Sequence, residues 1–266
     1  MDKIHRQYDR IRTIFNAIVI LITLAIITIV IVGCSIKSIS PTSDSAEAYI
    51  NRGLEYYSNG DLDSAISDFD KAIQLYPDSA EAYYNRGLAY YGKGDLNSAI
   101  SDFDKAIQLK PDLALAYSNR GLAYSLKGDL DRALSDCDLA IQLNPDLAEA
   151  YTVRGIVYAN QLDLDYAISD YDTAIQLNPN YAKAYYNRGN AYANNGDIEH
   201  AISDFNHAIQ INPKYTEAYI NRGISYTDKG DTENAIADIK KALELCGTNI
   251  QLCQYAQQLL QQLGGE

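Results

Sequence analysis

Three side chains of metal-ligand type lie close together in the sequence: His200, Asp204 and His207. Imidazole and carboxylate groups are common ligands of zinc and related metals. On a helix their spacing places them on one face, but the two histidines are then about 10 Å apart along the axis, too far to share one ion without distortion. We therefore favour a solvated helix face over a metal site and expect no bound metal.

No other arrangement of residues indicates catalysis. The chain contains three histidines in total, no glycine-rich phosphate loop and no nucleophile elbow. We therefore predict that the protein is not an enzyme and has no cofactor. The charge balance excludes nucleic acid as a partner, because the chain after Ile36 carries 18 basic and 33 acidic side chains, and binding phosphates depends on Lys and Arg. We expect neutral or basic proteins or peptides instead.

The elements that must position the side chains come from a repeat of 34 residues. Six units follow one another without insertion or deletion, spanning residues 46–79, 80–113, 114–147, 148–181, 182–215 and 216–249. Numbered within each unit, position 8 is always glycine, positions 20 and 27 are always alanine, and positions 4 and 11 are always tyrosine. Such regular identity at fixed positions predicts a solenoid of repeated structural units.

Each unit has the pattern of two amphipathic helices, with apolar stripes at positions 4, 8 and 11 and at positions 20, 24 and 27. If the chain reverses near positions 15 and 16, residues that lie level with each other in the two helices have position numbers that sum to about 31. Position 4 then lies opposite position 27 and position 11 opposite position 20, so each tyrosine faces an alanine. Aspartate at position 16 suits the N-cap of the second helix. Asp44, Asp78 and Asp146, each followed three residues later by glutamate, suit the cap of the next first helix.

Two charged positions are also invariant among the six units, arginine at position 7 and aspartate at position 23. Their numbers sum to 30, which places them level across each hairpin on the stripes that face each other. We predict a partly buried ion pair in every unit, with a structural role, because guanidinium can meet carboxylate with two hydrogen bonds. The pairs are Arg52 with Asp68, Arg86 with Asp102, Arg120 with Asp136, Arg154 with Asp170, Arg188 with Asp204, and Arg222 with Asp238.

This pattern resembles the tetratricopeptide repeat, with tyrosine at position 4 where that family often has tryptophan. The resemblance covers residues 46–249 and implies an all-α fold, a right-handed superhelix of six helix-turn-helix repeats whose first helices line a concave groove. The departures are few: Leu162 replaces a turn glycine, Cys137 and Ile239 replace the aromatic at position 24, and Gly247 replaces the last proline. We expect residues 250–263 to form a capping helix with a polar outer side.

In this family positions 2, 5, 6, 9, 12 and 13 of the first helices line the groove. Position 6 is asparagine in five units, namely Asn51, Asn85, Asn119, Asn187 and Asn221, and Val153 is the exception. This is similar to the asparagine ladder of the O-linked N-acetylglucosamine transferase, which holds an extended peptide by its backbone. Two interpretations stay open: the amides bind peptide groups of a ligand, or they pack neighbouring repeats together.

Larger apolar groove residues gather in the first two units. We expect them to be the better anchor surface, since tyrosine combines apolar area with a polar tip. These residues are Leu54, Tyr57, Tyr84, Leu88 and Tyr91. Glutamate at position 2 favours basic ligands, whereas the carboxylate clamp of chaperone-binding repeats needs basic groove residues, for which only Lys183 is available. That ligand class is therefore disfavoured.

The N-terminus predicts a membrane anchor over residues 1–34. Nineteen uncharged residues run from Ile14 to Val32, about the length that crosses a bilayer, and the basic residues before them predict a cytoplasmic N-terminus with the repeats outside. The end of this run resembles the lipobox of bacterial lipoproteins, in which Cys34 would be lipidated, whereas its length favours an uncleaved signal anchor. Residues 35–45 have the composition of a flexible linker.

Both forms of anchor place the repeats outside the cytoplasm, at the periplasm or cell surface. There Cys246 and Cys253 can form a disulfide, flanking the turn into the capping helix, whereas Cys137 at a core position should remain a thiol. The sequence thus predicts a membrane-tethered protein-interaction scaffold, an adaptor or assembly factor that binds polypeptide segments in its groove. The alternative is a regulatory subunit of a membrane-bound enzyme complex.

Overall fold

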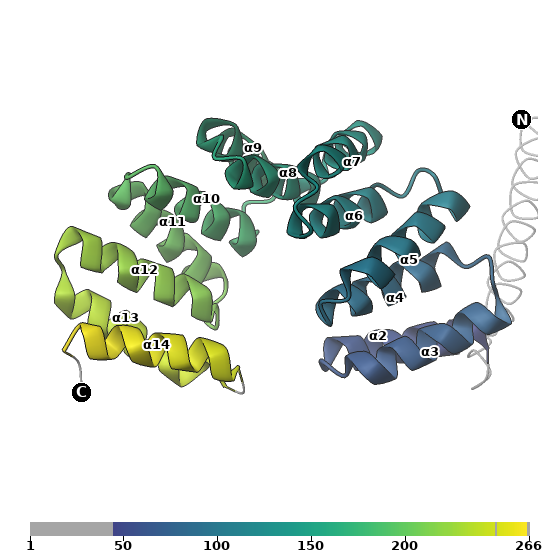
Figure 1. Ribbon diagram of the computed structural model, residues 1–266, viewed down its shortest axis with the longest axis horizontal. Helices are drawn as coiled ribbons and strands as arrows, with labels where there is room; N and C mark the ends of the chain where they lie inside the picture. Colours follow the sequence, from purple (N-terminus) through teal and green to yellow (C-terminus); the bar gives the residue numbers. More distant parts are fainter. Residues whose placement is uncertain (1–44, 248, 265–266) are drawn as a thin grey trace, which may run out of the picture.

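The computed structural model describes residues 45–247 and 249–264. The predicted anchor with Cys34, and the linker up to residue 44, lie outside these residues. The described part is all-helical (Figure 1), with thirteen helices. They are α2 (Ala46–Ser58), α3 (Leu62–Leu75), α4 (Ala80–Gly92), α5 (Leu96–Leu109), α6 (Ala114–Leu126), α7 (Leu130–Leu143), α8 (Ala148–Asn160), α9 (Leu164–Leu177), α10 (Ala182–Asn194), α11 (Ile198–Ile211), α12 (Thr216–Lys229), α13 (Thr232–Leu245) and α14 (Ile250–Gln262).

Each predicted unit is one hairpin of an even-numbered and an odd-numbered helix, and successive hairpins follow one another around an arch (Figure 1). The two helices of a hairpin make the largest contacts, and each second helix also packs on the first helix of the next unit. First helices of neighbouring units contact each other as well, from α2 with α4 to α10 with α12. Because neighbours are nearest on the inside of a curve, the first helices form the inner face of the arch.

The second helices are capped as the sequence predicts, except one. Asp61, Asp95, Asp129, Asp197 and Asp231 each accept a backbone N–H three residues on, whereas Asp163 makes no such bond.

The predicted caps of the first helices are wrong. Ser45 and Ser79 cap α2 and α4 in place of Asp44, which lies outside the described residues, and Asp78. Helix α8 begins after Leu147 without a side-chain cap, so Asp146 has no capping role. All first helices begin at the same position of the unit, whether the residue before it is Ser45, Ser79 or the uncapped Leu147, so the register does not depend on a side-chain cap.

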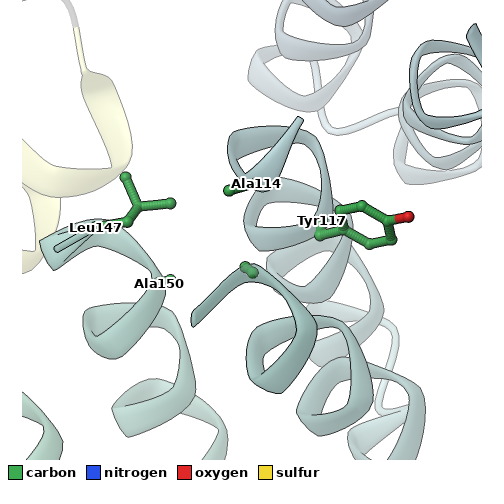
Figure 2. Close-up of a cluster of buried hydrophobic side chains, with 5 residues drawn as sticks. Ala114, Tyr117, Leu147 and Ala150 are labelled. Atoms are coloured by element: carbon green, nitrogen blue, oxygen red, sulfur yellow. The ribbon is translucent and has the colours of Figure 1, made fainter. Parts of the chain in front are cut away.

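Tyrosine and alanine meet in the core at the predicted positions. In the third unit Tyr117 and Ala140 belong to one cluster with Ala114 and Leu147, and this cluster continues into Ala150 of the next unit (Figure 2). The invariant glycine serves a close approach between the helices of a hairpin: a Cβ on Gly87 would lie 2.8 Å from the ring of Phe103 at position 24. The small residue therefore sets the distance between the two helices.

The C-terminal end is closed by α14, as expected of a capping helix. Its Ala256 and Leu260 are buried against Ile220 and Ile239 of the sixth unit. No helix of the described residues is both long and apolar enough to span a bilayer.

Candidate functional site

The first helix of the array presents two exposed apolar side chains on the inner face. Leu54 and Tyr57 of α2 are 38% and 36% exposed, and Asn51 on the same helix is exposed as well. No repeat precedes the first unit among the described residues, so these side chains are covered by α4 alone. They are the groove residues from the sequence analysis that remain most open to a ligand.

Tyr84, Leu88 and Tyr91 of α4 are only half-exposed, because they also pack between repeats. The Tyr84 hydroxyl accepts a hydrogen bond from Asn119 Nδ2 at 3.1 Å, and its ring lies 6.0 Å from that of Phe103. Burial raises the pKa of Tyr84 to about 12 and also raises the pKa of Tyr91. These residues form the wall of the inner face between the first three units, with part of each ring left accessible.

The asparagines at position 6 do not act as one uniform row. Asn119 and Asn221 each donate to the hydroxyl of the tyrosine at position 5 of the preceding unit, at 3.1 Å. Asn85 is buried and Asn51 is exposed. The packing interpretation therefore applies to at least Asn119 and Asn221, whose Nδ2 groups are occupied.

Asn187 differs because its Nδ2 is buried with no hydrogen-bond partner in the described part of the chain. The preceding unit has Thr152 at position 5, whose hydroxyl donates to its own helix at Ala148 O. Threonine is too short to replace the tyrosine hydroxyl, so this amide is left without an acceptor. A buried N–H donor without an acceptor destabilises the fold. Asn187 is therefore the asparagine of this row whose environment would be stabilised most by an added acceptor.

A cavity of about 340 Å³ opens between α10 and α12, at the C-terminal half of the inner face. Its polar lining comes from Asn190, Asn194, Asn221, Ser225 and Asp228. Asn221 Nδ2 donates to Asn190 Oδ1 at 2.7 Å, and Ser225 donates to the Asn221 carbonyl oxygen at 2.9 Å. The donors of Asn221 and Ser225 are thus occupied, whereas the Asp228 carboxylate makes no ion pair with any described residue. The cavity suits a ligand that brings hydrogen-bond donors or a positive charge.

The sequence analysis did not single out this cavity, because it ranked groove residues by apolar size. The available signal was Asn190 at position 9 of the fifth unit, where the other five units have leucine or isoleucine.

All six arginines at position 7 pair with the aspartate at position 23 of their own hairpin. Each uses Nε and Nη2 in two parallel hydrogen bonds; in the second unit both are 2.7 Å, from Arg86 to Asp102. The carboxylates are buried, 3–7% exposed as residues. All six guanidinium groups also lie over the tyrosine ring at position 4, and four of them lie over the ring at position 11 as well; Arg86 is 5.4 Å from Tyr83 and 5.9 Å from Tyr90. This arrangement adds cation–π attraction.

A third hydrogen bond, which the sequence analysis missed, joins each inner repeat to the one before it. Arg86 Nη1 donates to Asp70 of the first unit at 2.5 Å, and Arg120 and Arg154 reach Asp104 and Asp138 in the same way. Arg188 pairs with Asp172, and Arg222 donates to Asn206. We call this series the arginine ladder. Its signal was present in the sequence, since position 25 is aspartate in the first four units.

The six arginines at position 7 are all engaged in ion pairs that stabilise the fold, so they are not free to bind a ligand. The hydrogen bond to Asp68 raises the pKa of Arg52, and the same contact lowers the pKa of Asp68. At Asp102 burial dominates and raises the pKa of the carboxyl, although Arg86 opposes this. A buried carboxylate of this kind depends on its arginine for charge compensation.

The three residues of metal-ligand type are each engaged with a different partner. His200 contacts the Asp197 carboxylate at 2.7 Å, and His207 contacts the Ser203 carbonyl oxygen at 2.8 Å while stacking on Tyr185. Asp204 is paired with Arg188 within its own hairpin. Among the described residues no group of three His, Cys, Asp or Glu side chains could hold a metal ion.

The cysteines in the described residues take the two states expected from the sequence. Cys246 and Cys253 are joined by a disulfide, with their Cα atoms 5.5 Å apart, at the turn between α13 and α14. Cys137 is a buried free thiol in the core of the third unit, and burial raises its pKa, so it is unreactive.

Six hairpins in register, with their first helices on the inner face and a closing helix at the end, define an α-helical repeat scaffold of the kind that mediates protein–protein interactions. The comparison with family models gives the particular family. The "tetratricopeptide repeat" model matches residues 80–113, 114–147, 182–215 and 216–249, and a second "TPR repeat" model matches residues 53–94 and 163–196. The chain therefore belongs to the tetratricopeptide repeat family, whose members are generally non-catalytic scaffolds.

Solved structures share this fold. The Cut9–Hcn1 hetero-tetramer structure of the APC/C matches with a TM-score of 0.75 at 19% identity over 85% of this chain, which spans 44% of the chain it matches. PilF of Pseudomonas aeruginosa matches with a TM-score of 0.61 at 18% identity, over 80% of this chain and 96% of PilF. MamA matches with a TM-score of 0.50 at 30% identity, over 62% of this chain and 96% of MamA. No curated protein matches the chain.

Proposed function

We propose that this protein is a membrane-tethered scaffold outside the cytoplasm that binds basic polypeptide segments along its inner face. The observation that carries the proposal is the cavity between α10 and α12, whose Asp228 carboxylate makes no ion pair with a described residue. A lysine or arginine side chain of a bound segment supplies a positive charge to pair with this carboxylate.

The rest of the inner face supports an extended ligand of this type. Position 2 is glutamate in four units, at Glu47, Glu81, Glu149 and Glu217, and the chain as a whole has a net charge of −13. At the other end of the arch Leu54 and Tyr57 offer apolar area. A polypeptide with basic residues toward the sixth unit and apolar residues toward the first unit matches both ends.

Tethering rests on the sequence of the first 34 residues, with the apolar run from Ile14 to Val32 and the cysteine that follows it. The Cys246–Cys253 disulfide supports a location outside the cytoplasm, because disulfides persist in oxidising compartments. Fractionation of cells that express the full chain should recover the protein with membranes. Protease added outside the cytoplasmic membrane should degrade the repeats, and a protected, membrane-free protein would contradict this part of the proposal.

Peptide binding is tested with labelled twelve-residue peptides that carry lysine, alanine or glutamate at matched positions. Fluorescence anisotropy should show binding only for the lysine series, and Asp228→Asn should weaken it about threefold, because Asp228 is exposed and a solvent-accessible charge pair contributes about 0.5–1 kcal/mol. Asp146→Asn is the matched control, since Asp146 is an exposed loop carboxylate away from the inner face. Equal effects of the two substitutions, or equal binding of all peptides, would contradict the proposed site.

A further inference from the structure

The fourth repeat departs from the other five at the turn between its helices. Leu162 has φ of 66°, in the left-handed region, where the corresponding residues of the other units are Gly60, Gly94, Gly128, Gly196 and Gly230. Its side chain is 81% exposed. Tyr166, four residues further on in the first turn of α9, is 66% exposed. Neither side chain contributes to the core, and together they place two large apolar groups on one edge of the arch.

The same edge lacks a contact that other repeats make. A lysine at position 14 reaches back to position 18 of the preceding unit in three places: Lys93 to Asp63, Lys127 to Asn97, and Lys229 to Glu199. At the third–fourth junction position 14 is Gln161, and at the fourth–fifth junction it is Asn195. Within residues 45–247 and 249–264, Asp131 and Asp165 consequently form no ion pair.

A hollow of about 490 Å³ lies where the first of these lysine contacts is missing. It is lined by Lys127, Gly128, Asp129, Leu130, Asp131 and Gln161. Asp129 is already paired with Arg132 in its own turn, so Asp131 is the carboxylate left for a ligand. The hollow adjoins Leu162 through the peptide bond from Gln161.

We propose that this edge is a second docking surface, where a partner protein inserts a lysine or arginine into the hollow against Asp131 and packs an adjacent apolar side chain on Leu162 and Tyr166. Charge complementarity indicates a basic partner, because a lysine or arginine of the partner would contact Asp131 where a lysine of this chain contacts the equivalent carboxylate at other junctions. A second copy of this chain does not meet that requirement, because each copy carries a net charge of −13 and copies repel each other.

The test uses eight-residue peptides that contain lysine next to photo-leucine, with two matched peptides in which norleucine or glutamate replaces the lysine, so that all three carry the photoreactive group. The protein carries Asp228→Asn, so that the inner-face cavity does not contribute. After irradiation, mass spectrometry should place the crosslinks of the first peptide within residues 127–131 and 161–166. Each matched peptide should give at least tenfold less product.

The decisive variant is Gln161→Lys with Leu162→Gly, because it gives the fourth repeat the residues that other repeats already have. It should abolish the crosslinks and leave the unfolding temperature unchanged or higher. Leu75→Ser, which removes a leucine that is 55% exposed elsewhere, should leave them intact. Crosslinks that persist in the double variant, that map only to α10 and α12, or that fail to form with any peptide would overturn the proposal. So would a dimer in sedimentation that the double variant dissociates.

Discussion

Replacing Arg86 by methionine should be among the most destabilising single changes in this protein. Arg86 makes two hydrogen bonds of 2.7 Å to Asp102, a residue that is 5% exposed, and one of 2.5 Å to Asp70, whose side chain is 42% exposed. Methionine retains much of the apolar stem, so the volume change is small. The loss leaves the Asp102 carboxylate buried without its charge partner, which costs about 3–5 kcal/mol.

The two partners of Arg86 separate the contributions. Asp70→Asn removes the negative charge from the contact between repeats and keeps an acceptor oxygen, as Asn206 does for Arg222. Since the Asp70 carboxylate is partly solvated, we expect a cost of about 0.5–1 kcal/mol. The double variant Arg86→Met with Asp102→Leu removes both buried charges and should recover most of the stability lost by Arg86→Met alone, because no unpaired carboxylate remains.

The assay is urea unfolding of each variant, followed by circular dichroism at 222 nm. Repeat proteins unfold as coupled neighbours, so Asp70→Asn should also lower the m value, as the first repeat begins to unfold separately. Two results would refute the reasoning: a cost of less than about 1 kcal/mol for Arg86→Met, or no recovery in the double variant. Either result would mean that the Asp102 carboxyl becomes hydrated or protonated at little cost in the free energy of unfolding once Arg86 is removed.

Three further predictions concern the glycines, the disulfide and pH. Gly87→Ala should destabilise by about 1–3 kcal/mol in urea, because its Cβ would lie 2.8 Å from the Phe103 ring, whereas Gly92→Ala, at the end of α4 beside the flexible Leu62, should be neutral or stabilising. Reducing the Cys246–Cys253 disulfide should lower the free energy of unfolding by about 2 kcal/mol for this short loop, and urea curves that coincide with and without reductant would contradict this. The hydroxyl and backbone N–H of Ser98 lower the pKa of the capping Asp95, and Arg52 lowers the pKa of Asp68. These two carboxylates therefore stabilise the fold fully above their unfolded-state pKa of about 4, and the stabilisation is lost as pH falls through their lower folded-state pKa values. Thermal scans from pH 6 to 2 should show the unfolding temperature falling mainly below pH 4.

The repeat architecture followed from the sequence because its period fixes both the units and the facing positions. Glycine at position 8, tyrosine at 4 and 11, and alanine at 20 and 27 place two helices in each unit, and the sums of position numbers gave the pairing of Arg86 with Asp102 and of its counterparts. These contacts lie within one hairpin, where the separation along the chain determines which residues are level.

Contacts between hairpins could not be obtained in this way, because they depend on the angle at which one unit packs on the next. The bond from Arg86 to Asp70 and the cavity beside Asp228 both lie at such junctions. The roles of the asparagine row could not be decided from the sequence for the same reason: whether Asn119 or Asn187 finds a partner depends on position 5 of the unit before it, which is tyrosine in one case and threonine in the other.

In the arginine ladder each inner repeat contributes two groups. Its arginine at position 7 donates to the preceding unit, and its residue at position 25 accepts from the arginine of the following unit. A whole repeat could therefore be duplicated or lost by recombination without leaving any junction unmatched. Position 25 is still an acceptor in the fifth unit, where it is Asn206, but in the sixth unit it is Lys240, which cannot accept a hydrogen bond from an arginine. A seventh copy added after Lys240 would bring lysine against arginine, so growth of the array is confined to its interior.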